Sequence, residues 1–524
     1  MRAYTTEKEN IELRGRHRIY SDEYEVTPEN VIGIVQDALM IHEQNREEIA
    51  YLLRYEKGCQ PLKREKIVRS EINIEVVDNV ANQVTEFKLG YNWGNPSIFI
   101  QRGNKDIANN DKDVDDDAIS MLNEMNDAEA AFAKDQELAR FVEVTGIGHQ
   151  FVDIKRRYEE GGSVFDLETL NPLTSFVVHR NDIHETPLLG VTYRQLDNGT
   201  RYFTAISADR RYEIRDLVEI ENGEKVDEKW DFGPRSGERN PLGEIPIVEF
   251  VRAYDRMGCF ERQIPDMDAL NIEVSDFANA VAQDTQGMYW GNDFEFPKDA
   301  SGNVQKPVSG QWIMTRTLAN GTQPKIQPLQ SSFDYSGVQQ NIESKRNLIL
   351  QKCYVPLQTD PGGGSTASAM SMSSGWTAAE NAACKEEQII RRAKMQIAKL
   401  ELLAIQRSHH LPDDSPLKGL KLSDIAIKFT RLKTYDLGTK TNSMVAMLKA
   451  GINGRVAMQT VDLFPDVAQA WEDSKETIEK FQKSLFEKKE PADNFGRTQS
   501  DSTDQTGNSP ILDGMRTGGD ADAE

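Results

Sequence analysis

Few residues in this 524-residue chain have the spacing that metal or enzyme chemistry requires. The run Asp111-Lys-Asp113-Val-Asp115-Asp116 resembles the start of a calcium-binding EF-hand loop. Its sixth position is aspartate instead of glycine, and its twelfth is Leu122 instead of glutamate, so the motif is rejected. A solvated acidic loop is therefore predicted for residues 104–117.

Histidine and glycine motifs are also incomplete. His184-Glu185 lacks the second histidine of a zinc-protease helix, and His409-His410 has no acidic or thiol partner at a usable spacing. Gly146-Ile-Gly148 leads to Phe151 where a dinucleotide-binding fingerprint needs glycine. Neither a phosphate-binding GxxxxGK[ST] loop nor a GxSxG nucleophile elbow occurs. The sequence therefore singles out no catalytic residue, metal ligand or cofactor, although scattered nuclease carboxylates stay an open alternative.

The charge balance limits the kinds of partner. The chain has 85 acidic and 62 basic residues and a formal net charge of −23. Binding nucleic acid through a broad basic face needs clustered lysine and arginine, so it is not expected here. An acidic protein can still handle DNA if its task is to let the DNA pass without binding it tightly. The chain is 38% hydrophobic, which allows a buried core, and its length predicts roughly three or four domains.

Membrane and disulfide signals are missing from the sequence. No run of 18 apolar residues occurs, so no membrane span is predicted, and residues 1–10 do not resemble a signal peptide. The four cysteines are scattered and form no CxxC pair: Cys59, Cys259, Cys353 and Cys384. In a chain of this length the pattern favours a reducing compartment and buried thiols over a disulfide framework.

The elements are organised around residues 331–407, which predict a helix, a glycine-rich break and a longer helix. The first helix covers 337–354 and ends before Pro356, because proline has no backbone N–H and disfavours helix in the preceding residue. The small side chains of the break let the backbone approach another surface closely. Two interpretations are open: a flexible loop in a helical hairpin, or a loop that faces a large, smooth partner sliding past. The second helix, 376–407, carries one apolar stripe: Ile390, Ala393, Ile397, Leu400 and Ala404.

Periodicity and turn residues predict the other elements. Residues 1–26 are charged and weakly patterned, which indicates an arm. Between 165 and 250, alternating residues and the dipeptides Asn198-Gly199 and Asn222-Gly223 predict antiparallel hairpins. Residues 491–524, with seven acids and two arginines, predict a disordered tail. Further helices are predicted at 28–56, 73–89, 118–146, 264–286, 440–450, 454–461 and 465–486, and short strands at 97–101 and 425–429.

Four short segments, in order along the chain, resemble the portal proteins of tailed double-stranded DNA bacteriophages, closest to the siphophage type. The most specific is Ile264-Pro-Asp-Met-Asp-Ala-Leu-Asn271, followed by Ser275-Asp-Phe-Ala-Asn279. The strand-like segment 242–250 precedes it. Gly90-Tyr-Asn-Trp-Gly-Asn-Pro96 and Gly58-Cys-Gln-Pro61 are similar to motifs of the family early in the chain. The resemblance extends over about 28–485.

The resemblance implies an α+β subunit that assembles into a ring, typically of twelve copies, at one capsid vertex. DNA is packaged through such a ring and later leaves through it. The implied segments are an N-terminal arm at 1–27, a wing at 28–263, stem helices at 264–286 and 331–356, a small β-rich clip at 287–330, a tunnel loop at 357–375, a long wing helix at 376–410, an α-helical crown at 411–490 and a disordered acidic tail at 491–524.

Site residues are implied for three of these segments. The basic stem residues Lys345, Arg346 and Lys352 would place positive charge near the channel, or else form salt bridges. The apolar stem stripe predicts packing between subunits: Met267, Leu270, Val274 and Phe277. Partner binding by the clip, or its own small core, is expected of Trp290, Phe294, Phe296 and Trp312. The loop residues expected to face DNA are Gly362, Gly363, Gly364, Ser365, Thr366, Ser368 and Met370.

The implied partners are further copies of the chain, double-stranded DNA passing without sequence specificity, the terminase large subunit, a head–tail connector or adaptor, and the major capsid and scaffolding proteins. No cofactor, metal, membrane or enzymatic activity is expected. The chain would be made in the host cytoplasm and reside in the virion. Two alternatives stay open: another virion or scaffold-like interaction protein without a channel, which ring formation would separate, and a metal-dependent nuclease, which DNA cleavage would reveal.

Overall fold

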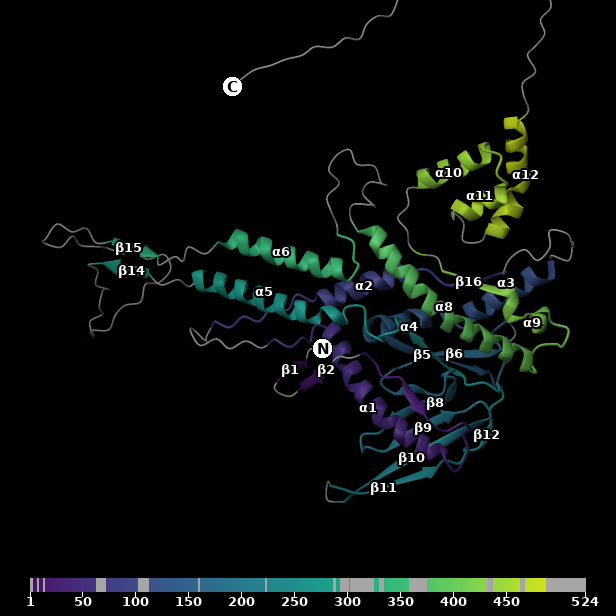
Figure 1. The fold of residues 1–524 in the computed structure, drawn as a ribbon, viewed down its shortest axis with the longest axis horizontal. Coiled ribbons are helices and arrows are strands. Elements are labelled where there is room, and N and C mark those ends of the chain that lie inside the picture. Colours follow the sequence, from purple (N-terminus) through teal and green to yellow (C-terminus); the bar gives the residue numbers. More distant parts are fainter. Residues whose placement is uncertain are drawn as a thin grey trace, which may run out of the picture. The chain divides into compact units, whose positions relative to one another are not determined.

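The chain folds as two units, residues 1–434 and 435–524, and each is described by itself. The first is α+β, and the described residues of the second form helices (Figure 1). The computed structural model describes residues 3–6, 9–12, 15–62, 72–101, 113–158, 161–221, 224–285, 289–292, 301, 325–328, 334–357, 375–429, 431, 437–461 and 467–486.

The larger sheet of the first unit has seven strands, in the order β11-β10-β9-β8-β7-β3, with β12 paired to β10. Neighbouring strands are antiparallel except β3, which lies parallel to β7. Gly199, at φ +86°, occupies the β8–β9 turn as the Asn-Gly signal predicts. The strands are β3 (Ile19–Ser21), β7 (Ser175–Arg180), β8 (Pro187–Gln195), β9 (Arg201–Ile206), β10 (Arg210–Glu221), β11 (Glu224–Phe232) and β12 (Glu238–Arg239).

Helix α1 (Val31–Glu56) packs against this sheet. Val35 and Leu39, one turn apart on the helix, share a buried cluster with Phe176, Val191 and Phe203 from the sheet. The alternation of the strands and the helical period of α1 thus bury one face of each element.

A second sheet has the order β13-β5-β6: β13 (Ile247–Val251), β5 (Ile147–Ile154) and β6 (Phe165–Leu170). Helices α4 (Ala131–Thr145) and α8 (Trp376–Arg407) pack on it. Their shared core contains Leu138, Val142, Phe250, Ile397 and Leu400. The predicted apolar stripe of α8 therefore faces the core of this unit.

Two distant segments complete this core. Strand β4 (Ile98–Gln101) pairs antiparallel with β16 (Ile425–Lys428), and α3 (Asp113–Ala128) packs beside them. Because β16 belongs to the first unit, the boundary between units falls at Thr434 and Tyr435, later than the crown start predicted at 411. Smaller elements are β1 (Ala3–Thr6), β2 (Glu9–Glu12), α9 (Pro416–Gly419) and η2 (Leu422–Asp424).

The α5–α6 hairpin consists of α5 (Ile264–Thr285) and α6 (Tyr335–Lys352), which lie antiparallel side by side (Figure 1). Between them in the chain, β14 (Tyr289–Asn292) and β15 (Lys325–Pro328) form an antiparallel ribbon. The base of α5 follows η1 (Glu261–Gln263) and packs with α1 and α2 (Val80–Trp93). The described residues therefore follow the order helix, two paired strands and helix.

The second unit contains α10 (Leu437–Lys449), α11 (Gly454–Val461) and α12 (Val467–Phe486). Its small core comprises Leu448, Ala457, Met458, Trp471 and Ile478. An ideal Cβ on Gly454 would lie 2.5 Å from the Trp471 ring, so glycine is needed where α11 meets α12. The predicted tail, 491–524, lies outside the described residues.

Several predicted boundaries are wrong. Residues 73–79, predicted as helix, are not helical, and α2 continues through Gly90 to Trp93. The predicted helix 118–146 is two helices separated at Ala130, which has φ +51°. Helix α3 begins at Asp113, inside the predicted acidic loop.

The predictions of an arm and of buried thiols also need correction. Residues 15–26 are part of the first unit: Arg16 is 2% exposed and donates to the Glu261 carboxylate at 2.5 Å. Cys353 is buried, but Cys59 and Cys384 are exposed. Among the described residues, no helix has the length and apolar character needed to cross a membrane.

Candidate functional site at the base of the 358–374 segment

Most predicted site residues lie outside the described part of the chain. This applies to all seven loop residues from Gly362 to Met370, and to Phe294, Phe296 and Trp312. Trp290 is in β14, where its backbone pairs with Gln327 across the ribbon. The site that can be built is therefore the base of the loop, where the chain leaves α6 and enters α8.

The two ends of the loop meet. An ideal Cβ on Gly375, which has φ +87°, would lie 3.8 Å from the Cα of Pro356. Gly375 is also the N-cap residue of α8, and Pro356 follows α6 by four residues. The intervening segment thus begins and ends at one point of the fold.

Aromatic side chains of α2 hold the end that enters α8. Phe87 and Tyr91 stack with ring centroids 5.5 Å apart. The centroid of the Trp376 ring lies 6.0 Å from that of Phe87 and 5.7 Å from that of Tyr91. The Tyr91 hydroxyl also donates to Glu380 on the first turns of α8 at 2.5 Å. Contacts of this type stabilise by more than their buried area alone, so α2 fixes the start of α8.

The end that leaves α6 is held by the same helix. Tyr354 has φ +59°, a conformation that a tyrosine adopts only when its surroundings impose it. The ammonium of Lys88, on α2, lies 5.9 Å from the centroid of the Tyr354 ring. Helix α2 therefore contacts both ends of the loop.

Lys88 also belongs to a buried ionic cluster, defined as Lys88, Glu143, Arg252 and Glu386. Arg252 donates to Glu386 at 2.5 Å, and the Lys88 ammonium lies 3.7 Å from the same carboxylate. Trp93 Nε1 donates to Glu143 at 3.2 Å. Burial, reinforced by the neighbouring Glu386 carboxylate, raises the pKa of Glu143 to about 7. This cluster joins α2, α4 and α8 with two acidic and two basic groups.

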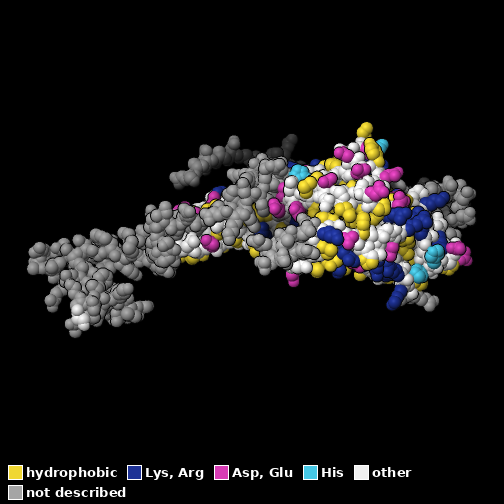
Figure 2. All heavy atoms as spheres, turned by 90° about the horizontal axis from the view of Figure 1, so that it is seen from below, with side chains coloured by type: hydrophobic (Ala, Val, Ile, Leu, Met, Phe, Trp, Pro, Cys, Tyr) yellow, Lys and Arg dark blue, Asp and Glu magenta, His cyan; other side chains and the backbone are white. Residues whose placement is uncertain are grey.

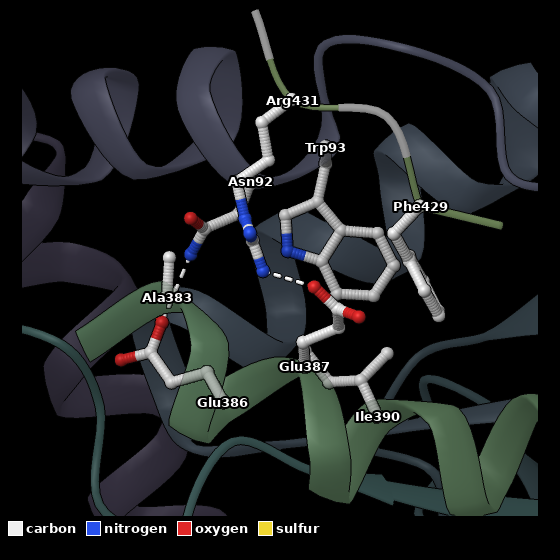
Figure 3. Close-up of a pocket in the computed structure, with 8 residues that line it drawn as sticks. All are labelled: Asn92, Trp93, Ala383, Glu386, Glu387, Ile390, Phe429 and Arg431. Atoms are coloured by element: carbon white, nitrogen blue, oxygen red, sulfur yellow. Dashed lines mark hydrogen bonds and ion pairs between the residues drawn. The ribbon is translucent and has the colours of Figure 1, made fainter. Parts of the chain in front are cut away.

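A narrow pocket beside this cluster is lined by side chains from three parts of the chain (Figure 3). Asn92 donates to Glu386 at 2.9 Å. Arg431 donates to Glu387 and, at 2.8 Å, to Glu380. Arg431 thus ties the segment after β16 to the start of α8. Each of these groups is engaged with a neighbour in positioning the helix.

The three basic residues of α6 form ion pairs within the chain. Lys345 pairs with Glu273, Arg346 with Asp78 at 3.1 Å, and Lys352 with Asp266 at 2.6 Å. Their side chains are each more than 40% exposed. The salt-bridge interpretation of these residues therefore holds within the chain.

Polar residues of α5 perform a role that the sequence analysis missed. The Asn271, Ser275 and Asn279 side chains accept hydrogen bonds from the backbone N–H groups of Asp78, Val76 and Ile74, at 2.9–3.0 Å. Ser275 and Asn279 also donate to carbonyls of the same segment. The i, i+4, i+8 spacing was visible in the sequence, but its partner lies about 200 residues away. These bonds explain why 73–79 is not helical.

The apolar stripe of α5 also has a partner within the chain. Met267 and Leu270 are fully buried in a cluster with Tyr55, Val84 and Ile349. Val274 and Phe277, further along the helix, are less buried. The prediction that this stripe packs between subunits is therefore wrong for Met267 and Leu270.

The charged groups of this site join α2, α4 and α8 through ion pairs and hydrogen bonds, which is a structural role. No group of three or more His, Cys, Asp or Glu side chains is placed to bind a metal in the described ranges. A family model described as phage portal protein, SPP1 Gp6-like, matches residues 39–484, and the chain belongs to this family. The portal family is a structural component of the phage capsid with a role in DNA packaging. No curated protein matches the sequence. The predicted family is confirmed.

Proposed function

We propose that the chain forms a ring of twelve subunits that serves as a DNA channel at one vertex of a phage capsid. Double-stranded DNA would be packaged through it, without sequence recognition, and would leave by the same route. The observation that supports this proposal is that both ends of the 358–374 segment meet at one place and are contacted by α2. A segment held in this way can present its small side chains at a fixed position.

The remaining segments take their roles from this arrangement. The α5–α6 hairpin is the stem, and residues 287–330 are the clip that contacts the terminase large subunit and later the head–tail connector. Residues 28–263 and α8 form the wing, which meets the major capsid and scaffolding proteins. Residues after 434 form the crown. The family match favours this function over a virion protein without a channel and over a nuclease.

The direct test of the ring is electron microscopy of the purified full chain, with mass photometry alongside. Rings with a central hole and a mass near twelve times 59.2 kDa are expected. A uniform monomer or dimer, also in the presence of its scaffolding and capsid proteins, would contradict the proposal.

The loop is tested by replacing Gly362, Gly363 and Gly364 with leucine. Rings should assemble as before, because the loop base is made by other residues, while DNA packaging should fail. Packaging at the normal level would show that these residues do not form the constriction. The matched control places leucines at Gly33 and Gly419, where an added Cβ meets nothing within 4 Å and φ is not in the left-handed region, to measure the cost of added bulk away from the loop.

A further inference from the structure

An open polar cleft lies where the β9–β10 turn, the end of β12 and the end of α8 meet, all within the first unit. The proposed function gives the residues of this cleft no specific role. Its charged lining residues come from four short segments of the chain: Asp209, Arg239, Arg407, His409, Asp413 and Lys418.

The turn that follows β12 forms one side of the cleft and is held by the buried side-chain amide of Asn240. Asn240 is 3% exposed, and its Nδ2 donates to the carbonyls of Ser207 at 2.8 Å and Glu244 at 2.7 Å. Its Oδ1 accepts from the backbone N–H of Leu242 at 3.1 Å. Since every polar atom of this amide is used inside the fold, the turn 240–244 is held in one conformation.

The turn 240–244 also positions the guanidinium of Arg407. Arg407, at the end of α8, donates from Nη1 to the carbonyl of Pro241 at 2.9 Å. An ideal Cβ on Gly243, which has φ +56°, would lie 2.6 Å from this nitrogen. Glycine is thus required for the arginine to lie against the turn. One donor of Arg407 is used there, and its other donors have no partner in the described part of the chain.

The other charges of the cleft are unevenly engaged. Lys418 donates to the exposed Asp413 at 2.8 Å. Arg239 and His409 are exposed, and neither has a carboxylate within ion-pair distance among the residues described. Figure 2 shows lysine and arginine side chains gathered on the face at the end of the first unit that carries β12 and α9. Arg239 and Arg407 thus lie at the cleft without a carboxylate partner among the described residues, in a chain whose net charge is −23.

We propose that this cleft binds an acidic peptide segment of a partner protein, with carboxylates seated on Arg239 and Arg407. Two guanidinium groups offer paired N–H donors that match carboxylate geometry. Asp209 and Asp413 at the cleft would repel a uniformly charged phosphate backbone, whereas a peptide of mixed charge can place a lysine or an amide beside them. The proposal needs neither the ring nor the DNA channel.

The test uses the full chain and a fluorescently labelled synthetic peptide in which pairs of glutamates alternate with one lysine and one serine, so that its net charge is negative, with anisotropy as the readout. Binding that weakens with added salt is expected, and Arg239→Gln with Arg407→Gln should lower the affinity by about tenfold or more. Arg392→Gln, an exposed arginine of α8 outside the cleft, is the matched control and should leave the affinity unchanged. Thermal unfolding of each variant verifies folding, and Arg239→Gln alone, whose side chain has no fold contact to lose among the described residues, repeats the test if the double variant unfolds.

Several outcomes would overturn the proposal. These are an unchanged affinity in the double variant, equal binding of a peptide with glutamine in place of glutamate, or no binding at millimolar peptide. Displacement of the peptide by a short DNA duplex at lower concentration than by unlabelled peptide would assign the cleft to nucleic acid instead. Because the readout is made on peptide binding, failure here leaves the ring test unaffected.

Discussion

Helix α8 and the α5–α6 hairpin are both long helical elements next to the same loop, yet they are held by different forces. Thirteen of the 32 residues of α8 are buried, against two of the 18 residues of α6. The buried set of α8 includes the ionisable residues Glu386, Lys394 and Glu401. Helix α6 buries only Ile349 and Leu350, at its base, and its basic residues form exposed ion pairs.

The difference shows which of the two elements is positioned by contacts within a single chain. A buried charge needs its partner at a defined place, and removing that partner is costly. Exposed pairs tolerate rearrangement and contribute little free energy. The protomer therefore fixes α8, while α6 keeps most of its surface available to other molecules.

The largest expected effect comes from breaking the ionic cluster that holds α8. Arg252→Ala removes the 2.5 Å partner of Glu386 and leaves Lys88 as the remaining basic group of the four-residue cluster. The free energy of unfolding should fall by about 3–5 kcal/mol, measured by urea denaturation. The control is Arg262→Ala, since Arg262 forms an ion pair with Asp255 while its own side chain is 65% exposed. A loss for Arg252→Ala no larger than that of the control would remove the basis of the comparison.

The second prediction compares a buried and an exposed position of α5 in the hairpin. Leu270→Ala, at a fully buried base position, should lower the stability of the protomer by about 2–5 kcal/mol, because a cavity is left among its neighbours. Val281→Ala, where the side chain is 41% exposed, should cost less than about 1 kcal/mol. Thermal unfolding of both variants as protomers measures the difference. Equal losses would mean that the whole hairpin is packed in the way α8 is.

The third effect is a dependence on pH that belongs to α8. Burial raises the pKa of Glu401 to about 7, above its value near 4.5 in an unfolded chain. The native state therefore holds this proton when the unfolded state has released it, and stability falls as pH rises from about 4.5 to 7. This decrease in the free energy of unfolding, up to about 3 kcal/mol in the wild type, should be absent from the Glu401→Gln variant.

Urea denaturation at several pH values, with wild type and variant side by side, makes this measurement. Lys345→Gln, in the exposed pair with Glu273, serves as the comparison and should leave the pH profile of wild type in place. Parallel profiles for Glu401→Gln and wild type would show that this carboxylate is not titrating in the native protein.

The smallest effect is expected on α6. Lys345→Ala removes an ion pair whose side chains are 43% and 32% exposed. The stability of the protomer should change by less than about 1 kcal/mol, and less still at high salt. A loss comparable to that of Arg252→Ala, seen in the same urea titration, would erase the distinction between the two elements.

Much of the local structure followed from the sequence. The bounds of α8 and α11 and the β8–β9 turn agree with the predictions, and α5, described over Ile264–Thr285, lies within its predicted range. These features depend on periodicity and on residues such as Pro356 and Gly199, whose effects are confined to their neighbours. The order of short motifs was also enough to indicate the family, which the match over 39–484 confirms.

Tertiary structure alone decided how these elements are joined. Residues 73–79 carry a helical pattern, but Asn271, Ser275 and Asn279 bind their backbone and keep them out of a helix. The β4–β16 pair and the Lys88–Tyr354 contact likewise join segments more than 250 residues apart. Periodicity reports which face of an element is apolar, but it does not report which distant segment covers that face, because that depends on the packing of the whole unit.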